Sequence, residues 1–363
     1  MEEPVTSLIE DKVLIVLGAG ASKEFGLPTG KELSERIINL LAIKEDRFNP
    51  AFSDYEFNRA VEISIRSQLI NGGKQSALDS ANLLRRGLVI APSIDNFLHT
   101  HRRDADTVFL GKLAIVTILL RAEAASKLTV DVTNLYNVMD LKKVADTWLG
   151  LLFTQLSVAG DFFSFISRLS RINFISFNYD RCVQQFFTHA SRQYFDLSET
   201  EVATVLANLN LIYIYGSVGP YQIRSKNESS FGGTTSAELL IELAGQIQTF
   251  TEGRISQDGT ELADIIDCSR EVYFLGFGFN KLNVERILGD KAYACGSVFA
   301  TVKGQPELAA AQIRRDIDQR FGHHVVDGSG QRVNVGSVTP VFKNSTCAEL
   351  IWDCHRNFQT APD

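Results

Sequence analysis

Short apolar runs that stop abruptly at small or polar residues recur along the chain. The first, residues 13–17, reads Val-Leu-Ile-Val-Leu and stops at a glycine. A strand that is apolar on both faces is typical of the buried centre of a parallel sheet. Similar runs lie at residues 171–177, 211–215, 271–275 and 297–302, and the first three of these also end in a small or polar loop. The pattern therefore predicts five strands, with ligand-binding loops at their carboxyl ends.

The long stretch between the first two strands, residues 31–170, has helical periodicity instead. It begins after Thr29, which is followed three residues later by Glu32, the signature of a capped helix start. Further helical segments lie near residues 53–71, 75–87, 94–101, 106–127, 139–158 and 161–171. Helices also separate the later strands, and two short strands are expected near residues 323–326 and 338–342.

The alternation of strands and helices predicts an α/β fold with a Rossmann-like, doubly wound parallel sheet. The expected Rossmann domain consists of residues 1–30 and 171–345. Residues 31–170 are expected to form a large helical insertion over the ligand-binding edge of the sheet, and residues 346–363 a C-terminal tail. A chain of 363 residues is long enough for a core with such an insertion.

Composition and charge narrow the class of partners. Hydrophobic residues make up 45% of the chain and charged residues 22%, the balance of a globular protein. The net charge of -7 provides no basic surface of the kind that binds nucleic-acid phosphates or anionic lipid. No apolar run approaches the roughly 18 residues of a membrane-spanning helix. We therefore expect no direct nucleic-acid partner and no membrane partner. The acidic start, without a basic and apolar signal segment, indicates a cytoplasmic protein.

The five cysteines are widely spaced, and none forms a C-x-x-C pair. Zinc ribbons need such pairs, and disulfide frameworks need an even set at close spacing. We therefore expect reduced thiols, no zinc module and no metal ligands.

The first strand runs directly into Gly18-Ala19-Gly20-Ala21-Ser22, and a helix follows. Glycines at such a turn let the backbone approach a diphosphate, and the free N–H groups of a helix start favour an anion. The dehydrogenase form of this motif needs a third glycine where this chain has Lys23, and a P-loop needs Ser or Thr where it has Glu32. The turn thus indicates nucleotide binding of another kind, or else a merely tight connection between strand and helix.

Four motifs, each at the end of a predicted strand, resemble those of the sirtuin-like NAD-binding family. They are Gly18-Ala19-Gly20-Ala21-Ser22 with Gly26-Leu27-Pro28-Thr29, then Phe177-Asn178-Tyr179-Asp180, then Gly216-Ser217, and finally Leu275-Gly276-Phe277-Gly278-Phe279-Asn280. The resemblance covers about residues 12–30 and 171–302, and it is closest to bacterial sirtuin-like NAD hydrolases of anti-phage defence systems. In the helical block, Ser93-Ile94-Asp95-Asn96-Phe97-Leu98 also looks like a segment of those proteins.

This resemblance implies that NAD binds, as a substrate, along the carboxyl edge of the sheet, and that no metal is needed. The first motif would hold the NAD diphosphate, Pro28 and Thr29 would lie beside the nicotinamide ribose, and the last motif would lie beside the adenosine ribose. The expected cofactor-binding residues are Gly18, Ala19, Gly20, Ser22, Pro28, Thr29, Asp95, Asn96, Gly216, Ser217, Gly276, Phe277 and Gly278. For Asp95 and Asn96 a plain helix start is the alternative interpretation.

The expected catalytic residues are Asn178, Asp180 and Tyr215. An asparagine can orient water or the carboxamide, and a carboxylate near the anomeric carbon would stabilise the positive charge that develops as the glycosidic bond breaks. The alternative for Asn178 and Asp180 is capping of the helix that begins near residue 181. Tyr215 stands where the family has its catalytic histidine, and a tyrosine with a pKa of about 10 is a poor base at neutral pH. Help is then expected from Asp180 or from His99, His101 or His189.

These residues predict an NAD hydrolase that releases nicotinamide and ADP-ribose. Sirtuin deacylases hold their peptide beside a four-cysteine zinc module, and without such a module water is the expected acceptor. Because a free NAD hydrolase would harm its own cell, we expect a gated effector that works as a homo-oligomer or in a complex with a sensor subunit. The alternatives are a catalytically weak sensor or regulatory subunit that binds NAD or ADP-ribose, and a scaffold that binds no nucleotide.

Overall fold

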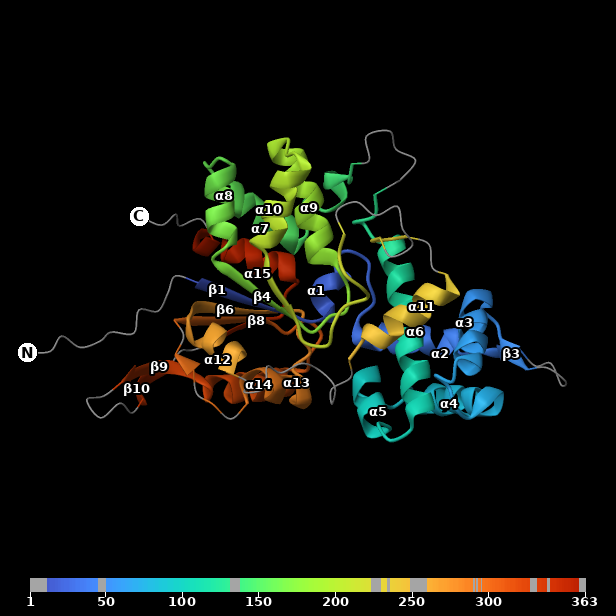
Figure 1. Ribbon diagram of the computed structural model, residues 1–363. Helices are drawn as coiled ribbons and strands as arrows, with labels where there is room; N and C mark the ends of the chain where they lie inside the picture. Colours follow the sequence, from blue (N-terminus) through green and yellow to red (C-terminus); the bar gives the residue numbers. More distant parts are fainter. Residues whose placement is uncertain are drawn as a thin grey trace, which may run out of the picture.

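The protein is built around one six-stranded sheet in which every strand pair is parallel (Figure 1). The computed structural model describes residues 12–44, 50–130, 138–222, 230–233, 236–248, 260–289, 291, 293–294, 296–326, 332–337 and 340–358. Across the sheet the strands are β11 (Val341–Lys343), β8 (Ser297–Thr301), β6 (Ser269–Leu275), β1 (Lys12–Leu17), β4 (Ile172–Ser176) and β5 (Asn210–Tyr213). The five strands expected from the apolar runs are all present, so the Rossmann-like α/β sheet is confirmed.

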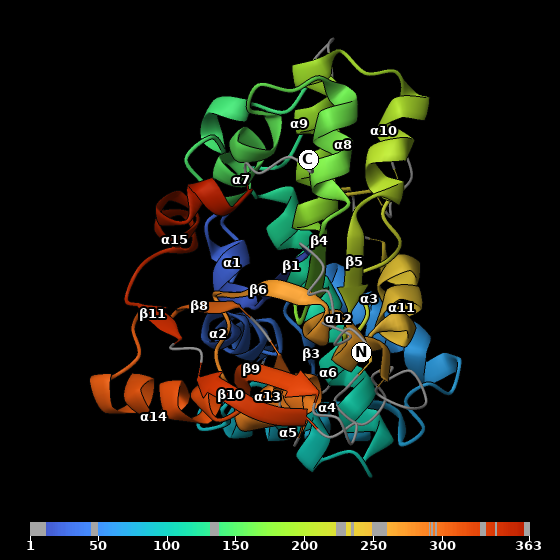
Figure 2. The ribbon, with the colours of Figure 1, turned by 90° about the vertical axis from the view of Figure 1, so that its left-hand side faces the viewer.

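The order of the strands creates a crevice beside β1. From β1 the chain builds the sheet outward through β4 and β5 on one side, and then returns to build it through β6, β8 and β11 on the other, as Figure 2 shows. The connections therefore leave β1 and β6 in opposite directions. In open parallel sheets, ligands bind at the carboxyl ends of the strands where the order reverses in this way.

Helices cover both faces of the sheet, which explains why the first strand is apolar at every position. Val13, Ile15 and Leu17 face one hydrophobic core, whereas Leu14 and Val16 face another. The first core is covered by α7 (Trp148–Ser157), α8 (Phe162–Leu169), α9 (Cys182–Phe195), α10 (Glu199–Ala207) and α15 (Cys347–Asp353). The second is covered by α12 (Thr260–Asp267), α13 (Lys281–Leu288) and α14 (Glu307–Asp318). Figure 1 shows these two layers above and below the sheet.

A helical bundle lies beside the sheet and continues its second core. At its centre is α6 (Ala105–Ala124), which is buried along most of its length. Around it lie α2 (Gly30–Leu40), α3 (Tyr55–Arg66), α4 (Gly73–Gly87), α5 (Ile94–Thr100) and α11 (Ala237–Gln246). The bundle thus contains α11, which comes from outside residues 31–170, whereas α7 and α8 from inside that range pack on the sheet. The domain boundaries given above stay predictions.

Some local features agree with the expectations from the sequence, whereas others are visible only in the structure. Thr29 and Glu32 form the expected capping box at the start of α2. The helical block contains one short hairpin, β2 (Ile43–Lys44) with β3 (Ala51–Phe52). A separate three-stranded sheet combines β7 (Tyr293–Ala294), β9 (Phe321–Val326) and β10 (Arg332–Ser337). β9 contains the strand expected near residues 323–326, and β11 overlaps the one expected near residues 338–342, of which residues 338–339 lie outside the described residues. β2, β3 and β7 have two residues each, which is too short for a periodicity to be seen in the sequence. None of the described helices combines the length and the apolar character that crossing a membrane requires.

Candidate functional site

The turns after β1 and β6 touch each other through their backbones. The N–H of Gly18 donates to the carbonyl of Leu275, and the N–H of Gly20 donates to the carbonyl of Gly276, both at 3.0 Å. Gly276 has a φ of +58°, and a Cβ at this position would lie 2.1 Å from the nitrogen of Ala21. A Cβ on Gly18 would lie 2.6 Å from the Gly276 carbonyl oxygen. These glycines are therefore required by the contact between the two turns, whatever ligand the turns bind.

The loop after β4 joins the same place through a buried hydrogen-bonded cluster. The Asn178 Nδ2 atom donates to the carbonyl of Gly18 at 2.9 Å and to the Ser22 Oγ atom at 3.0 Å. Ser22 in turn donates to the Asp180 Oδ2 atom at 2.6 Å. Exposed fractions are only 9% for Asn178 and 7% for Asp180. The structure thus brings together four of the residues that the motifs singled out, Gly18, Ser22, Asn178 and Asp180, from two segments that are far apart in the chain.

The capping interpretation of this loop holds only in part: the N-cap of α9 is Arg181, which has no side-chain cap bond, but Asp180 accepts one backbone N–H from the first turn. The first turn of α9 contains Cys182, whose backbone N–H donates to the Asp180 Oδ1 atom at 3.1 Å. No described N–H of α9 donates to the side chain of Asn178, whose amide nitrogen instead donates to the segment after β1. Both carboxylate oxygens of Asp180 are therefore already engaged within the protein.

Tyr215, which follows β5, lies buried at the crevice with an exposed fraction of 2%. Its ring packs on Phe177 with the centroids 5.8 Å apart, and Phe177 packs on Phe277 at 5.0 Å, so the loops after β4, β5 and β6 meet in one aromatic cluster. The hydroxyl donates to the Oδ1 atom of Asn283 on α13 at 2.8 Å. Burial raises the pKa of Tyr215 far above its ordinary value. This tyrosine therefore stays protonated at neutral pH and is no general base.

The helical bundle reaches the crevice through Asp95 in the first turn of α5. The hydroxyl of Tyr179, which stands between Asn178 and Asp180, donates to the Asp95 Oδ1 atom at 2.5 Å. Burial raises the pKa of Asp95, although the Tyr179 hydrogen bond lowers it in part. Ser93 caps α5, so the plain helix-start interpretation is also correct for this segment. Asp95 combines both roles: it lies in a capped first turn, and it contacts the loop after β4.

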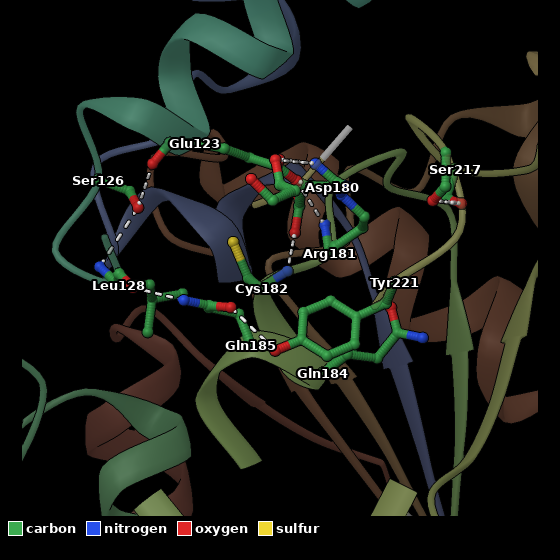
Figure 3. Close-up of polar contacts among 12 residues, drawn as sticks. Glu123, Ser126, Leu128, Asp180, Arg181, Cys182, Gln184, Gln185, Ser217 and Tyr221 are labelled. Carbon is green, nitrogen blue, oxygen red and sulfur yellow. Dashed lines mark hydrogen bonds and ion pairs between the residues drawn. The ribbon is translucent and has the colours of Figure 1, made fainter. Parts of the chain in front are cut away.

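A buried ion pair, which the motifs did not reveal, also holds this loop (Figure 3). Arg181 and Glu123, at the end of α6, are both fully buried, and the Arg181 Nη2 atom lies 2.5 Å from the Glu123 Oε2 atom. The backbone N–H of Arg181 also donates to the Glu123 Oε1 atom at 3.0 Å. A charged residue directly after the Asn-Tyr-Asp motif was the only sequence signal for it. The pair fixes the loop to the bundle at a second point.

Other predicted site residues make local contacts or are buried. The Thr29 Oγ1 atom serves the capping box, and the Ser217 Oγ atom donates to the carbonyl of Gly219 at 2.9 Å. Pro28 is buried. The backbone N–H of Asn96 donates to the Oγ atom of Ser93, the N-cap of α5. The predicted residues that remain at least partly exposed, and hence accessible to a ligand, are Ala19, Gly20, Thr29, Asp95, Asn96, Gly216, Ser217, Gly276 and Gly278.

Two of the three histidines offered as replacements lie in helices, and His101 directly follows one. His189 is buried in α9, and burial lowers its pKa to about 4. The His101 ring rests on Phe97 at the end of α5, and His99 lies within α5. Within the described residues, no hydrogen bond joins any of them to Asn178, Asp180 or Tyr215.

The described residues contain no group of three or more His, Cys, Asp or Glu side chains arranged to hold a metal ion. Cys182, Cys268, Cys347 and Cys354 are free thiols, and Cys295 lies outside the described residues. No protein-family model matches this chain, and no curated protein matches it significantly. The family resemblance therefore rests on the motifs alone.

Proposed function

We propose that the protein is a sirtuin-like NAD+ hydrolase that cleaves the bond between nicotinamide and ribose and releases nicotinamide and ADP-ribose. One observation carries this proposal: the four segments that resemble the family meet at the point where the strand order reverses. Gly20 contacts Gly276, Asn178 contacts Gly18, and the ring of Phe177 contacts both Tyr215 and Phe277. Parallel strands bring their carboxyl-end loops to one edge, and the proposal is supported because each of these four loops carries a motif of the family.

The contacts of Asn178 and Asp180 suggest how they act on the substrate. Because the Asn178 amide nitrogen is bonded to Gly18 and Ser22, its oxygen is the atom that it can offer to the nicotinamide amide or to water. The Asp180 carboxylate is fixed by Ser22 and by the start of α9. Its negative charge would stabilise the oxocarbenium-like ribose as the carbon–nitrogen bond breaks.

Burial of these residues supports a gated enzyme. Asn178, Asp180 and Tyr215 are exposed by 9%, 7% and 2%, so the crevice has to open before NAD reaches them. The bundle touches the loop after β4 at Asp95 and at Glu123. A second copy of the chain or a sensor subunit that moves the bundle would therefore act on the catalytic loop. We propose that such a complex is the NAD-depleting effector of a bacterial anti-phage defence system.

Release of nicotinamide from NAD tests this function. The full-length protein, alone and with the products of its neighbouring genes, should release nicotinamide, and Asn178→Ala should abolish the release. Asn82→Ala, at an exposed position of α4, serves as the control and should leave it unchanged.

A second candidate function, a sensor that binds NAD or ADP-ribose without cleaving it, is favoured by the buried and protonated Tyr215. In that case calorimetry detects binding of NAD or ADP-ribose, but no nicotinamide appears under any condition. Absence of both binding and cleavage would contradict both candidates and favour a scaffold.

A further inference from the structure

Three carboxylates surround the loop after β4, and they differ in how much of their bonding capacity is used. Asp180 is engaged at both oxygens, by Ser22 and by the backbone of Cys182. Glu123 is fully buried and neutralised by Arg181 (Figure 3). Asp95 differs from both, because only one of its carboxylate oxygens accepts a hydrogen bond from another described residue.

Asp95 is held at one oxygen and open at the other. Its Oδ1 atom accepts the hydrogen bond from Tyr179, while Oδ2 accepts none from any other described residue. Asp95 as a whole residue has intermediate exposure, in contrast to the buried Asn178, Asp180 and Tyr215, although its carboxyl group is desolvated by burial. Once the crevice opens for NAD, Oδ2 is the carboxylate oxygen that Asp95 can offer to a water molecule, because the Tyr179 hydroxyl already holds Oδ1.

The charges around Asp95 suit a proton acceptor. Burial makes the carboxylate more basic than a free aspartate, and no cation offsets that effect directly. The titratable and charged groups that face it are Tyr179 from the loop after β4, Tyr215 from the loop after β5 and, beyond Tyr215, Arg286 from α13. Tyr215 remains protonated and so cannot compete for the proton.

We propose that Asp95 accepts the proton of the water that attacks the ribose, an assignment that rests on the proposed NAD hydrolysis. The water oxygen forms a bond to the anomeric carbon, and the bond from that carbon to the pyridine nitrogen breaks. The electron pair of the broken bond goes to the nicotinamide nitrogen, and the proton passes from the water to the Asp95 carboxylate and then to solvent. The helical bundle thereby contributes a catalytic group to a site otherwise built on strand ends.

Asp95→Asn in the full-length protein tests the assignment, with nicotinamide release and NAD binding measured together. We expect release to fall by about 100-fold or more, the usual effect of losing a general base, while NAD binding changes little. Azide should restore product as ADP-ribosyl azide, because this anion attacks without losing a proton. Asp79→Asn, at an exposed position of α4, is the matched control and should keep the normal rate.

Tyr179→Phe provides a second test that a purely structural role would not affect. Its hydroxyl lowers the pKa of Asp95, so removing it should move the acid limb of the kcat/KM profile to higher pH. Undiminished release by Asp95→Asn would overturn the assignment, and so would a loss that azide fails to restore or an acid limb that stays in place in Tyr179→Phe. If the wild-type protein releases no nicotinamide with any partner, the proposed hydrolysis fails, and the role of Asp95 fails with it.

Discussion

The backbone N–H of Gly20 donates to the carbonyl of Gly276 at 3.0 Å, so the turns after β1 and β6 touch without any side chain between them. This contact lies at the point where the strand order reverses, between β1 and β6. It also predicts which glycine of the last motif is needed for folding and which is not.

Gly276→Ala should destabilise the protein strongly. The new Cβ would lie 2.1 Å from the Ala21 nitrogen, at a φ of +58° that disfavours any side chain. We expect a loss of about 2–5 kcal/mol in the free energy of unfolding, from overpacking and backbone strain together. Denaturation by urea measures it. Gly278→Ala is the control, because nothing lies within 4 Å of its Cβ position. Equal stability of the two variants would contradict the close contact of the turns.

Glu123→Gln should also be costly, because it leaves the buried Arg181 guanidinium without its charged partner. Breaking a buried ion pair from one side typically costs about 3–5 kcal/mol. The matched control is Glu238→Gln, which breaks the exposed pair of Glu238 with Arg59 and should cost less than about 1 kcal/mol. Thermal unfolding of both variants separates the two cases, and a Glu123→Gln protein as stable as the control would show that the pair does not hold the loop.

The free energy of unfolding should decrease as the pH is lowered, because His189 is buried in its neutral form. Its pKa is lowered from 6.5 to about 4 in the folded protein. Between these two values the unfolded chain is protonated at this histidine and the folded protein is not. Stability is therefore complete above pH 6.5 and is lost progressively as the pH falls towards 4. Between about pH 7.5 and pH 5 this histidine alone should remove about 2 kcal/mol.

The comparison of His189→Gln with the wild type isolates this contribution, because the variant lacks the titrating ring. Urea denaturation at both pH values should give a smaller difference for His189→Gln than for the wild type. His355→Gln, near the end of the described chain, should keep the full difference. If the wild type and His189→Gln lost the same free energy of unfolding between the two pH values, the predicted contribution of His189 would be wrong.

Tyr215→Phe should leave nicotinamide release within about threefold of the wild type if the proposed hydrolysis is correct. The hydroxyl is protonated at working pH and is bonded to Asn283, so it supplies no base. The phenylalanine ring retains the contact with Phe177, and stability should fall by about 1 kcal/mol for the lost hydrogen bond. A large drop in release with normal NAD binding would instead give the Tyr215 hydroxyl a direct part in the reaction.

Local sequence patterns were sufficient to predict the sheet and the positions of its loops. The run from Val13 to Leu17 is apolar at every position because alternate side chains face two different cores, and this demand is visible in the sequence alone. The capping box of Thr29 and Glu32 was equally predictable, because both partners lie within one turn. The convergence of the motif loops follows from the parallel sheet, since parallel strands present their carboxyl ends at one edge.

Contacts between distant segments had to await the tertiary structure. Arg181 pairs with a residue 58 positions away and Tyr179 with one 84 positions away, and no periodicity links such partners. Whether Tyr215 lies in solvent or beneath an aromatic cluster depends on how Phe177 and α13 pack around it. Hydrophobic periodicity reports only which face of a strand or helix is buried. The neighbour that buries it, and the pKa that results, are set by packing summed over the whole chain.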